Sequence, residues 1–197
     1  MSEQLVPIEE AIAHHPHDEM NPFEIISVQE LNAYQRLQKK HDEVYHHEIF
    51  VLGVSQRMKH VVLHLVKYLD LLFSLPASSS ENKRAFIDSF IMIVSASNLL
   101  GIPLAGSLST AEVNSFDGNF INEYIKLLSG LAKACEATDH QEDYPIRAMW
   151  NKNTQRFFLL LVHEAISRDI SILEEASHRL ASVEMNYSLN NVLQEAE

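Results

Sequence analysis

The long apolar run Phe86–Leu100 constrains the fold more than any other part of the sequence. It has the length of a helix, and a helix that is apolar on nearly all sides is buried inside a protein. Gly101 follows the run and Pro103 comes two residues later, which is the usual order at the C-terminal end of a helix. The sequence therefore predicts a buried helix over Asn82–Leu100, around which the other segments pack.

A second helix is predicted directly before the buried one, over Ser55–Leu75. On this helix His60, His64 and Lys67 fall at positions i, i+4 and i+7, so they form one polar stripe beside an apolar face. A stripe of two imidazoles and an ammonium group is the first candidate for a functional site.

Polar side chains also interrupt the buried helix, chiefly at Asp88, Ser95 and Asn98. A buried carboxylate needs a cation or hydrogen-bond donors as partners, or its pKa rises until it is neutral. A purely structural interpretation pairs Asp88 with Lys67 or with a histidine. A functional interpretation makes Asp88 a ligand of a metal ion or a substrate.

The rest of the sequence is typical of an all-α protein. Among 197 residues there are only 5 glycines and 6 prolines, and no long stretch alternates between apolar and polar residues as a half-buried strand would. We therefore expect a helical bundle. We divide the chain into a flexible polar arm at 1–22, a single all-α domain at 23–185 and a polar tail at 186–197.

Helical spacing of apolar residues predicts three further helical segments, at 27–52, 119–137 and 146–185. Ser27 with Glu30 has the spacing of a capping box, which predicts a helix start at the first of them. Ser78 with Glu81 repeats this spacing just before the buried helix.

Charge and composition limit the partners of the protein. The net charge is −12, with 27 acidic residues against 15 basic ones, so we expect no nucleic acid partner. No apolar run is long enough to span a bilayer, and the N-terminus lacks the features of a signal peptide. The single cysteine, Cys135, allows no internal disulfide and fits a reducing compartment. We expect a cytoplasmic protein without a membrane partner.

The run Phe86–Ile102 resembles the helix that closes the active site in the MazG-like all-α nucleotide pyrophosphohydrolases. In that family an aspartate opens a long apolar helix, an Asp or Asn follows ten residues later, and a Gly-Ile pair ends it. The matching residues here are Asp88, Asn98 and Gly101-Ile102. The preceding segment, Met58–Leu69, is similar to the family's first metal-binding helix. The resemblance covers about residues 45–105 and leaves about 106–185 as a C-terminal helical extension.

The resemblance implies cleavage of a nucleoside triphosphate to a monophosphate and pyrophosphate, with Mg²⁺ bridging the phosphates and Mn²⁺ or Zn²⁺ as alternatives. The family's four acidic metal-binding positions are occupied here by His64, Lys67, Ala85 and Asp88. Mg²⁺ prefers oxygen ligands, so only Asp88 keeps the family's role. The resemblance thus implies Asp88 and Lys67 as catalytic residues, and Asn98, Lys67 and Ser95 as substrate contacts.

Two functions follow from this altered set of residues. In the first, the protein is still a hydrolase, and Glu43, Glu48 or a second chain supplies the missing carboxylates. In the second, it is a non-catalytic relative that binds a nucleotide or a partner protein. Lys67 would then carry positive charge where the metal ion would otherwise lie.

A third interpretation is a transition-metal site. His60 and His64, with Asp88 from the neighbouring helix, make a set of two histidines and one carboxylate that suits Zn²⁺, Mn²⁺ or Fe²⁺.

Two further features concern packing. The apolar density of Phe86–Leu100 exceeds what a short helical hairpin can cover, so we expect a homodimer that buries this helix. Trp150, with Arg147 and Arg156 nearby, fits either a core position or a patch that stacks on a base, and the core position is favoured.

Overall fold

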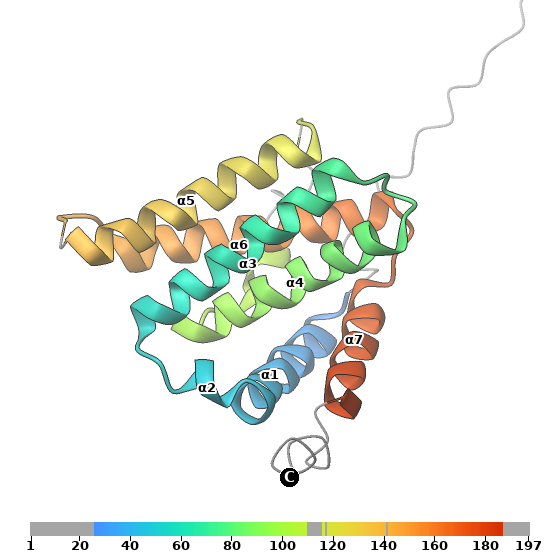
Figure 1. The fold of residues 1–197 in the computed structure, drawn as a ribbon, viewed down its shortest axis with the longest axis horizontal. Helices are drawn as coiled ribbons and strands as arrows, with labels where there is room; N and C mark the ends of the chain where they lie inside the picture. Colours follow the sequence, from blue (N-terminus) through green and yellow to red (C-terminus); the bar gives the residue numbers. More distant parts are fainter. Residues whose placement is uncertain (1–25, 110–115, 117, 141, 187–197) are drawn as a thin grey trace, which may run out of the picture.

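A computed structural model describes residues 26–109, 116, 118–140 and 142–186 of the protein. These residues form an all-α fold without a β-strand, as predicted (Figure 1). The helices are α1 (Val28–Tyr45), α2 (His47–Phe50), α3 (Val54–Ser74), α4 (Ser80–Leu100), the 3-10 helix η2 (Leu104–Ser109), α5 (Phe120–His140), α6 (Ile146–Ser167) and α7 (Ile172–Asn186). The expected polar arm at 1–22 and nearly all of the expected tail lie outside the described residues. No helix of the described chain is long and apolar enough to cross a membrane.

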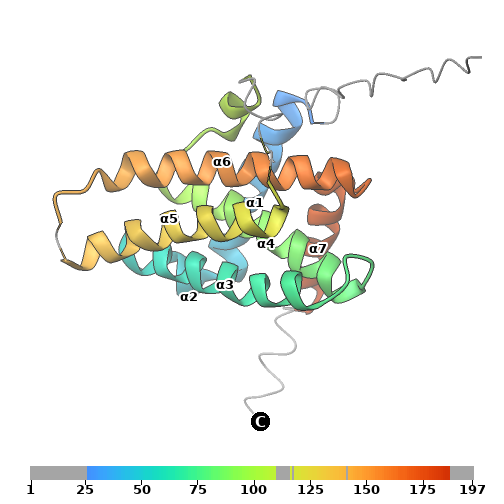
Figure 2. The same cartoon turned by 90° about the horizontal axis from the view of Figure 1, so that it is seen from above.

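The long helices α3, α4, α5 and α6 form a bundle. In this bundle α3 packs against α4 and α5, and α6 packs against the same two helices. Figure 2 shows α5 running alongside both α6 and α3. The remaining helices α1 and α7 pack against α4 and against each other, so α4 has neighbours on several sides. This arrangement gives the protein a layer of two helices beside the bundle (Figure 1).

The buried helix is confirmed. Phe86, Phe90, Ile93, Val94 and Ala96 of α4 are all 0% exposed. Helix α4 is covered by α1, α3, α6 and α7 of the same chain, because the C-terminal helices fold back over it. The sequence-based reason for a homodimer was therefore wrong, and the homodimer itself stays a prediction.

The predicted helix ends are mostly confirmed. Ser27 and Glu30 form the capping box of α1: the Glu30 N–H donates to Ser27 Oγ at 3.2 Å, and the Ser27 N–H donates to Glu30 Oε2 at 3.0 Å. Gly101 ends α4 in the left-handed region, with φ of 67°. The cap of α4 is Ser79 rather than Ser78, and it accepts the N–H of Asn82 at 3.1 Å.

Two long predicted helical segments are each divided in the structure. The first breaks at His46, whose φ of −129° and ψ of 39° end α1 and allow α2 to turn away. The second breaks after Ser167, where Asp169 adopts a φ of 53°. Arg168 holds this turn, because its side chain donates to Glu164 at 2.7 Å and to Asn82 of α4 at 2.9 Å. This turn returns α7 to the surface of α4.

Candidate functional site

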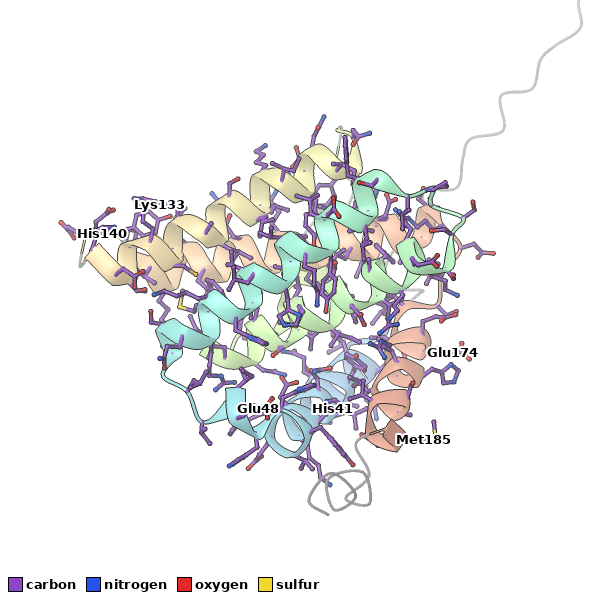
Figure 3. The ribbon with its side chains drawn as sticks, viewed as in Figure 1. His41, Glu48, Lys133, His140, Glu174 and Met185 are labelled. Atoms are coloured by element: carbon purple, nitrogen blue, oxygen red, sulfur yellow. The ribbon has the colours of Figure 1, made fainter. Side chains whose placement is uncertain are left out.

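A pocket of about 440 Å³ lies between α1, α2, α3, α4 and α7. Figure 3 labels His41 and Glu48 on the α1 and α2 side of it, and Lys133 and His140 far away at the end of α5. Most of the candidate residues from the sequence line this pocket: His60, His64, Lys67, Asp88 and Ser95. The structure thus brings together the polar stripe of α3 and two of the three polar positions of α4.

The pocket follows α3, whose lining residues extend from Arg57 to Tyr68. Along the axis of this helix, Arg57 and Lys67 are about 15 Å apart. Since α3 and α4 are joined by a short turn and pack side by side, Arg84 and Asp88 of α4 lie near Lys67, and Ser95 lies near the other end. We call these the Asp88 end (Lys67, Tyr68, Arg84, Asp88, Arg179) and the Arg57 end (Asp42, Glu48, Phe50, Arg57, Ser95).

At the Asp88 end, the partner of Asp88 is an arginine. Arg179 Nε of α7 donates to Asp88 Oδ1 at 2.9 Å, and Arg84 Nε lies 3.8 Å from Asp88 Oδ2. The expected pairing of Asp88 with Lys67 or a histidine was wrong. In the described part of the chain Lys67 forms no ion pair, and its ammonium lies 4.8 Å from the centre of the Tyr68 ring. This leaves Lys67 available to a ligand.

At the Arg57 end, Asp42 is held by two donors. Ser95 Oγ donates to Asp42 Oδ2 at 2.6 Å, and Gln38 Nε2 donates to Asp42 Oδ1 at 2.7 Å. Ser95 therefore orients Asp42. The Arg57 guanidinium lies 4.7 Å from the centre of the Phe50 ring, which is a cation–π distance.

Asn98 lies outside this pocket. Its Nδ2 donates to the Gln35 carbonyl at 2.9 Å, and its Oδ1 accepts from Gln35 Nε2 at 3.3 Å. It lines a separate shallow recess of about 240 Å³ beside Gly101. The position of Asn98 supports a role in joining α4 to α1, and its predicted contact with a substrate has no support from the pocket.

Four histidines, His41, His46, His60 and His64, line the pocket among the described residues. The rings of His60 and His64 are 4.4 Å apart, and His64 Nδ1 lies 3.1 Å from Tyr68 Oη. Burial is the largest cause that lowers the pKa of His64 to about 4, and the neighbouring His60 and Lys67 contribute to this shift. Burial also lowers the pKa of His60 and of His41. Burial therefore favours the neutral form of all three imidazoles.

His41 is the most buried of these histidines, at 3% exposed. Neither of its ring nitrogens makes a well-formed hydrogen bond within the described chain, but the lowering of its pKa by burial is opposed by a hydrogen bond with the Leu180 backbone of α7. His41 is therefore a buried polar residue in the pocket wall, next to α7.

The lowered pKa values predict a loss of stability on mild acidification. Between pH 7 and pH 5 the unfolded chain takes up protons at histidines of pKa about 6.5, whereas His64 stays neutral in the folded protein until pH about 4. The free energy of unfolding should therefore fall as the pH falls. We expect His64 to contribute on the order of 1 kcal/mol, after allowance for solvent screening. Urea unfolding at pH 7 and at pH 5 measures this change in the free energy of unfolding.

The control for this prediction compares two histidines. His64→Gln should lose less stability than the wild type between pH 7 and pH 5, while a variant of the exposed His47, His47→Gln, should lose as much as the wild type. An equal pH effect in all three proteins would contradict the prediction.

The described residues contain no group of three or more His, Cys, Asp and Glu side chains arranged to hold a metal ion. Asp88 is paired with Arg179, and Ala85 is 1% exposed in the core. Asp42 and Glu48 line the pocket, whereas the side chain of Glu43 does not. The Mg²⁺ site and the His60, His64 and Asp88 site both stay predictions.

Sequence reasoning missed the three arginines of the pocket, Arg57, Arg84 and Arg179. Arg179 lies 91 residues beyond Asp88 in the sequence, and only the return of α7 brings the two together. The density of titratable groups at 41–48 was a visible signal for Asp42, His41 and Glu48.

Comparisons of the chain with protein-family models, with curated proteins and with solved structures found no match.

Proposed function

We propose that this protein binds a phosphorylated small molecule, with a nucleotide as the first candidate, in the pocket between α3, α4 and α7. The observation that carries the proposal is the set of cations around that pocket. Within the described chain these are Arg57, Lys67, Arg84 and Arg179. Guanidinium and ammonium groups form charge-assisted hydrogen bonds with phosphate oxygens, which are stronger than neutral ones.

The charge of the pocket contrasts with that of the whole chain. The chain carries −12, yet the four described cations of the pocket outnumber its described carboxylates, Asp42, Glu48 and Asp88. Such a local excess of positive charge attracts an anion to this place and not to the rest of the surface. The volume of about 440 Å³ is in the ordinary range for a small-molecule site.

The shape of the pocket favours a ligand with two different ends. The Asp88 end offers Lys67, Arg84 and Arg179 to phosphate groups. At the other end, Arg57 and Phe50 supply flat surfaces on which a planar ring can stack. A separation of about 15 Å along α3 suits a nucleotide with its base at one end and its phosphates at the other. The MazG-like resemblance favours the same class of ligand.

Hydrolysis of a nucleoside triphosphate is the second candidate. Three carboxylates line the pocket within the described residues, and in the MazG-like family carboxylates hold Mg²⁺. Binding without catalysis is favoured, because His64 and Lys67 occupy two of the family's acidic positions and Asp88 already pairs with Arg179.

The test is a calorimetric titration with the common nucleoside mono-, di- and triphosphates, with and without Mg²⁺, together with an assay for released monophosphate and pyrophosphate. We expect binding without turnover. Lys67→Met should weaken binding about tenfold, the equivalent of one charge-assisted contact of about 1.4 kcal/mol.

The matched control is Lys126→Met on α5, because Lys126 is exposed and lies outside the pocket. It should bind like the wild type. Failure of every nucleotide to bind would overturn the proposed function, and release of pyrophosphate that depends on Asp88 would favour the hydrolase.

A further inference from the structure

The Asp88 end of the pocket carries an unbalanced charge. Among the described side chains, Lys67, Arg84 and Arg179 face a single carboxylate there, Asp88, which leaves a net charge of +2. The side chains of Asp88 and Arg179 are 12% and 25% exposed and balance each other, so the excess charge lies on Lys67 and Arg84, which are exposed at the mouth of this end. A dianionic group would neutralise this end of the pocket.

The cations at this end keep unused hydrogen-bond donors. Arg179 contacts Asp88 through Nε alone, and in the described part of the chain no hydrogen bond uses either of its terminal nitrogens. A guanidinium has five N–H groups, four of them on the terminal nitrogens. Arg84 approaches Asp88 only at 3.8 Å, so this pair is loose and Arg84 is free to turn to another anion.

Asp88 holds Arg179 against the pocket. The 2.9 Å contact fixes the guanidinium of α7 at the end of α3 and α4 where Lys67 lies. An arginine that is already oriented loses less side-chain entropy when a ligand binds. In this arrangement the carboxylate positions a cation and needs no metal ion for that role.

We propose that the Asp88 end is a phosphate site that works without a metal ion, in which Arg179, Arg84 and Lys67 bind a phosphate or diphosphate group and Asp88 positions Arg179. This inference rests on the proposed function and adds how the phosphates are held. It also makes α7 part of the site, because a bound phosphate joins α7 to α3 and α4. Inorganic phosphate, pyrophosphate and the phosphates of a nucleotide share this chemistry.

The experiment titrates the full-length protein with inorganic pyrophosphate in EDTA, and then with Mg²⁺ in place of EDTA. We expect binding in EDTA, weakened by added salt because charges are screened. Arg179→Gln should weaken it at least tenfold. Arg84→Gln should weaken it about fivefold, and since the Arg84 side chain is 67% exposed this variant leaves the fold intact even if loss of Arg179 disturbs α7.

The matched control is Lys83→Gln. Lys83 precedes Arg84 on α4 and pairs with Glu175, but it does not line the pocket. It should bind pyrophosphate like the wild type. Equal weakening by Lys83→Gln and Arg84→Gln would mean general attraction by surface charge, and would overturn the proposal.

Asp88→Asn separates this site from a metal site. The amide oxygen of Asn can still accept from Arg179 Nε and so keep Arg179 in position, while the negative charge beside the bound phosphate is removed. Pyrophosphate in EDTA should therefore bind at least as tightly as in the wild type. If Asp88 were instead a ligand of Mg²⁺, binding of pyrophosphate would require Mg²⁺ and would be lost in Asp88→Asn. Binding of nucleotides or pyrophosphate only with Mg²⁺ would overturn this inference and leave the proposed function standing, whereas no binding in either condition would overturn both.

The position of Arg179 on α7 also predicts that this helix becomes more stable when the ligand binds. Amide hydrogen exchange in α7 should slow when pyrophosphate binds, because the ligand adds contacts between Arg179 and the rest of the pocket. The same exchange in α5, which does not line the pocket, should not change. Unchanged exchange in α7 under saturating pyrophosphate would overturn the role of Arg179.

Discussion

Replacing Trp150 by alanine is expected to lower the free energy of unfolding by about 3–5 kcal/mol. Trp150 is 0% exposed near the start of α6. Its Nε1 donates to the carbonyl of Ala96 in α4 at 3.1 Å, so the substitution removes both a large buried ring and a contact between two helices of the bundle. The core position favoured from the sequence is confirmed.

Urea unfolding followed by circular dichroism measures the effect, since Trp150 is the only tryptophan and its removal eliminates the usual fluorescence signal. Trp150→Phe keeps an aromatic ring but loses the hydrogen bond, and should cost about 1–2 kcal/mol. The control is Phe73→Ala, which removes a ring that is 75% exposed and should cost less than about 0.5 kcal/mol. Equal losses in Trp150→Ala and Phe73→Ala would contradict the described core.

The second large effect is expected at Gln35 of α1. This side chain is 8% exposed and joins α1 to the end of α4. Its Nε2 donates to Ser97 Oγ at 3.0 Å and to the Ile102 carbonyl at 3.0 Å, and its Oε1 accepts the Leu104 N–H at 3.0 Å. Gln35→Met keeps the size of the side chain but removes these bonds from the Ile102 carbonyl and the Leu104 N–H, while Ser97 Oγ keeps its bond to the Val94 carbonyl. The substitution should cost about 2–4 kcal/mol.

The same unfolding measurement tests this prediction. Arg36→Met is the matched control, because Arg36 is the next residue on α1 and is exposed. It should change the free energy of unfolding by less than about 0.5 kcal/mol. A loss at Gln35 no larger than that at Arg36 would show that the α1 contact contributes little to holding the end of α4.

The sequence predicted the buried helix α4 and several of the pocket residues that α3 and α4 supply. Helical periodicity placed Lys67 and both α3 histidines on one stripe, and the apolar run identified α4 and Asp88 as its unusual carboxylate. These features are local, because residues three or four apart on a helix share a face whatever surrounds it. The pocket contains them as expected.

The sequence did not predict which residues complete the pocket. Asp88 pairs with Arg179, and Asn98 turns toward Gln35 instead of the pocket. Both outcomes depend on the faces that α1 and α7 present to α4. Periodicity gives the face of a helix but does not identify the helix that packs on it.

The sequence by itself determined the helical class, the buried α4, the capping of α1 and the left-handed end of α4 at Gly101, because propensity, periodicity and helix caps act over a few residues. The tertiary structure decided that α4 is covered by its own chain, that α7 returns at Asp169, and that four cations meet around one pocket. These features depend on contacts between residues more than ninety positions apart, which no local pattern encodes.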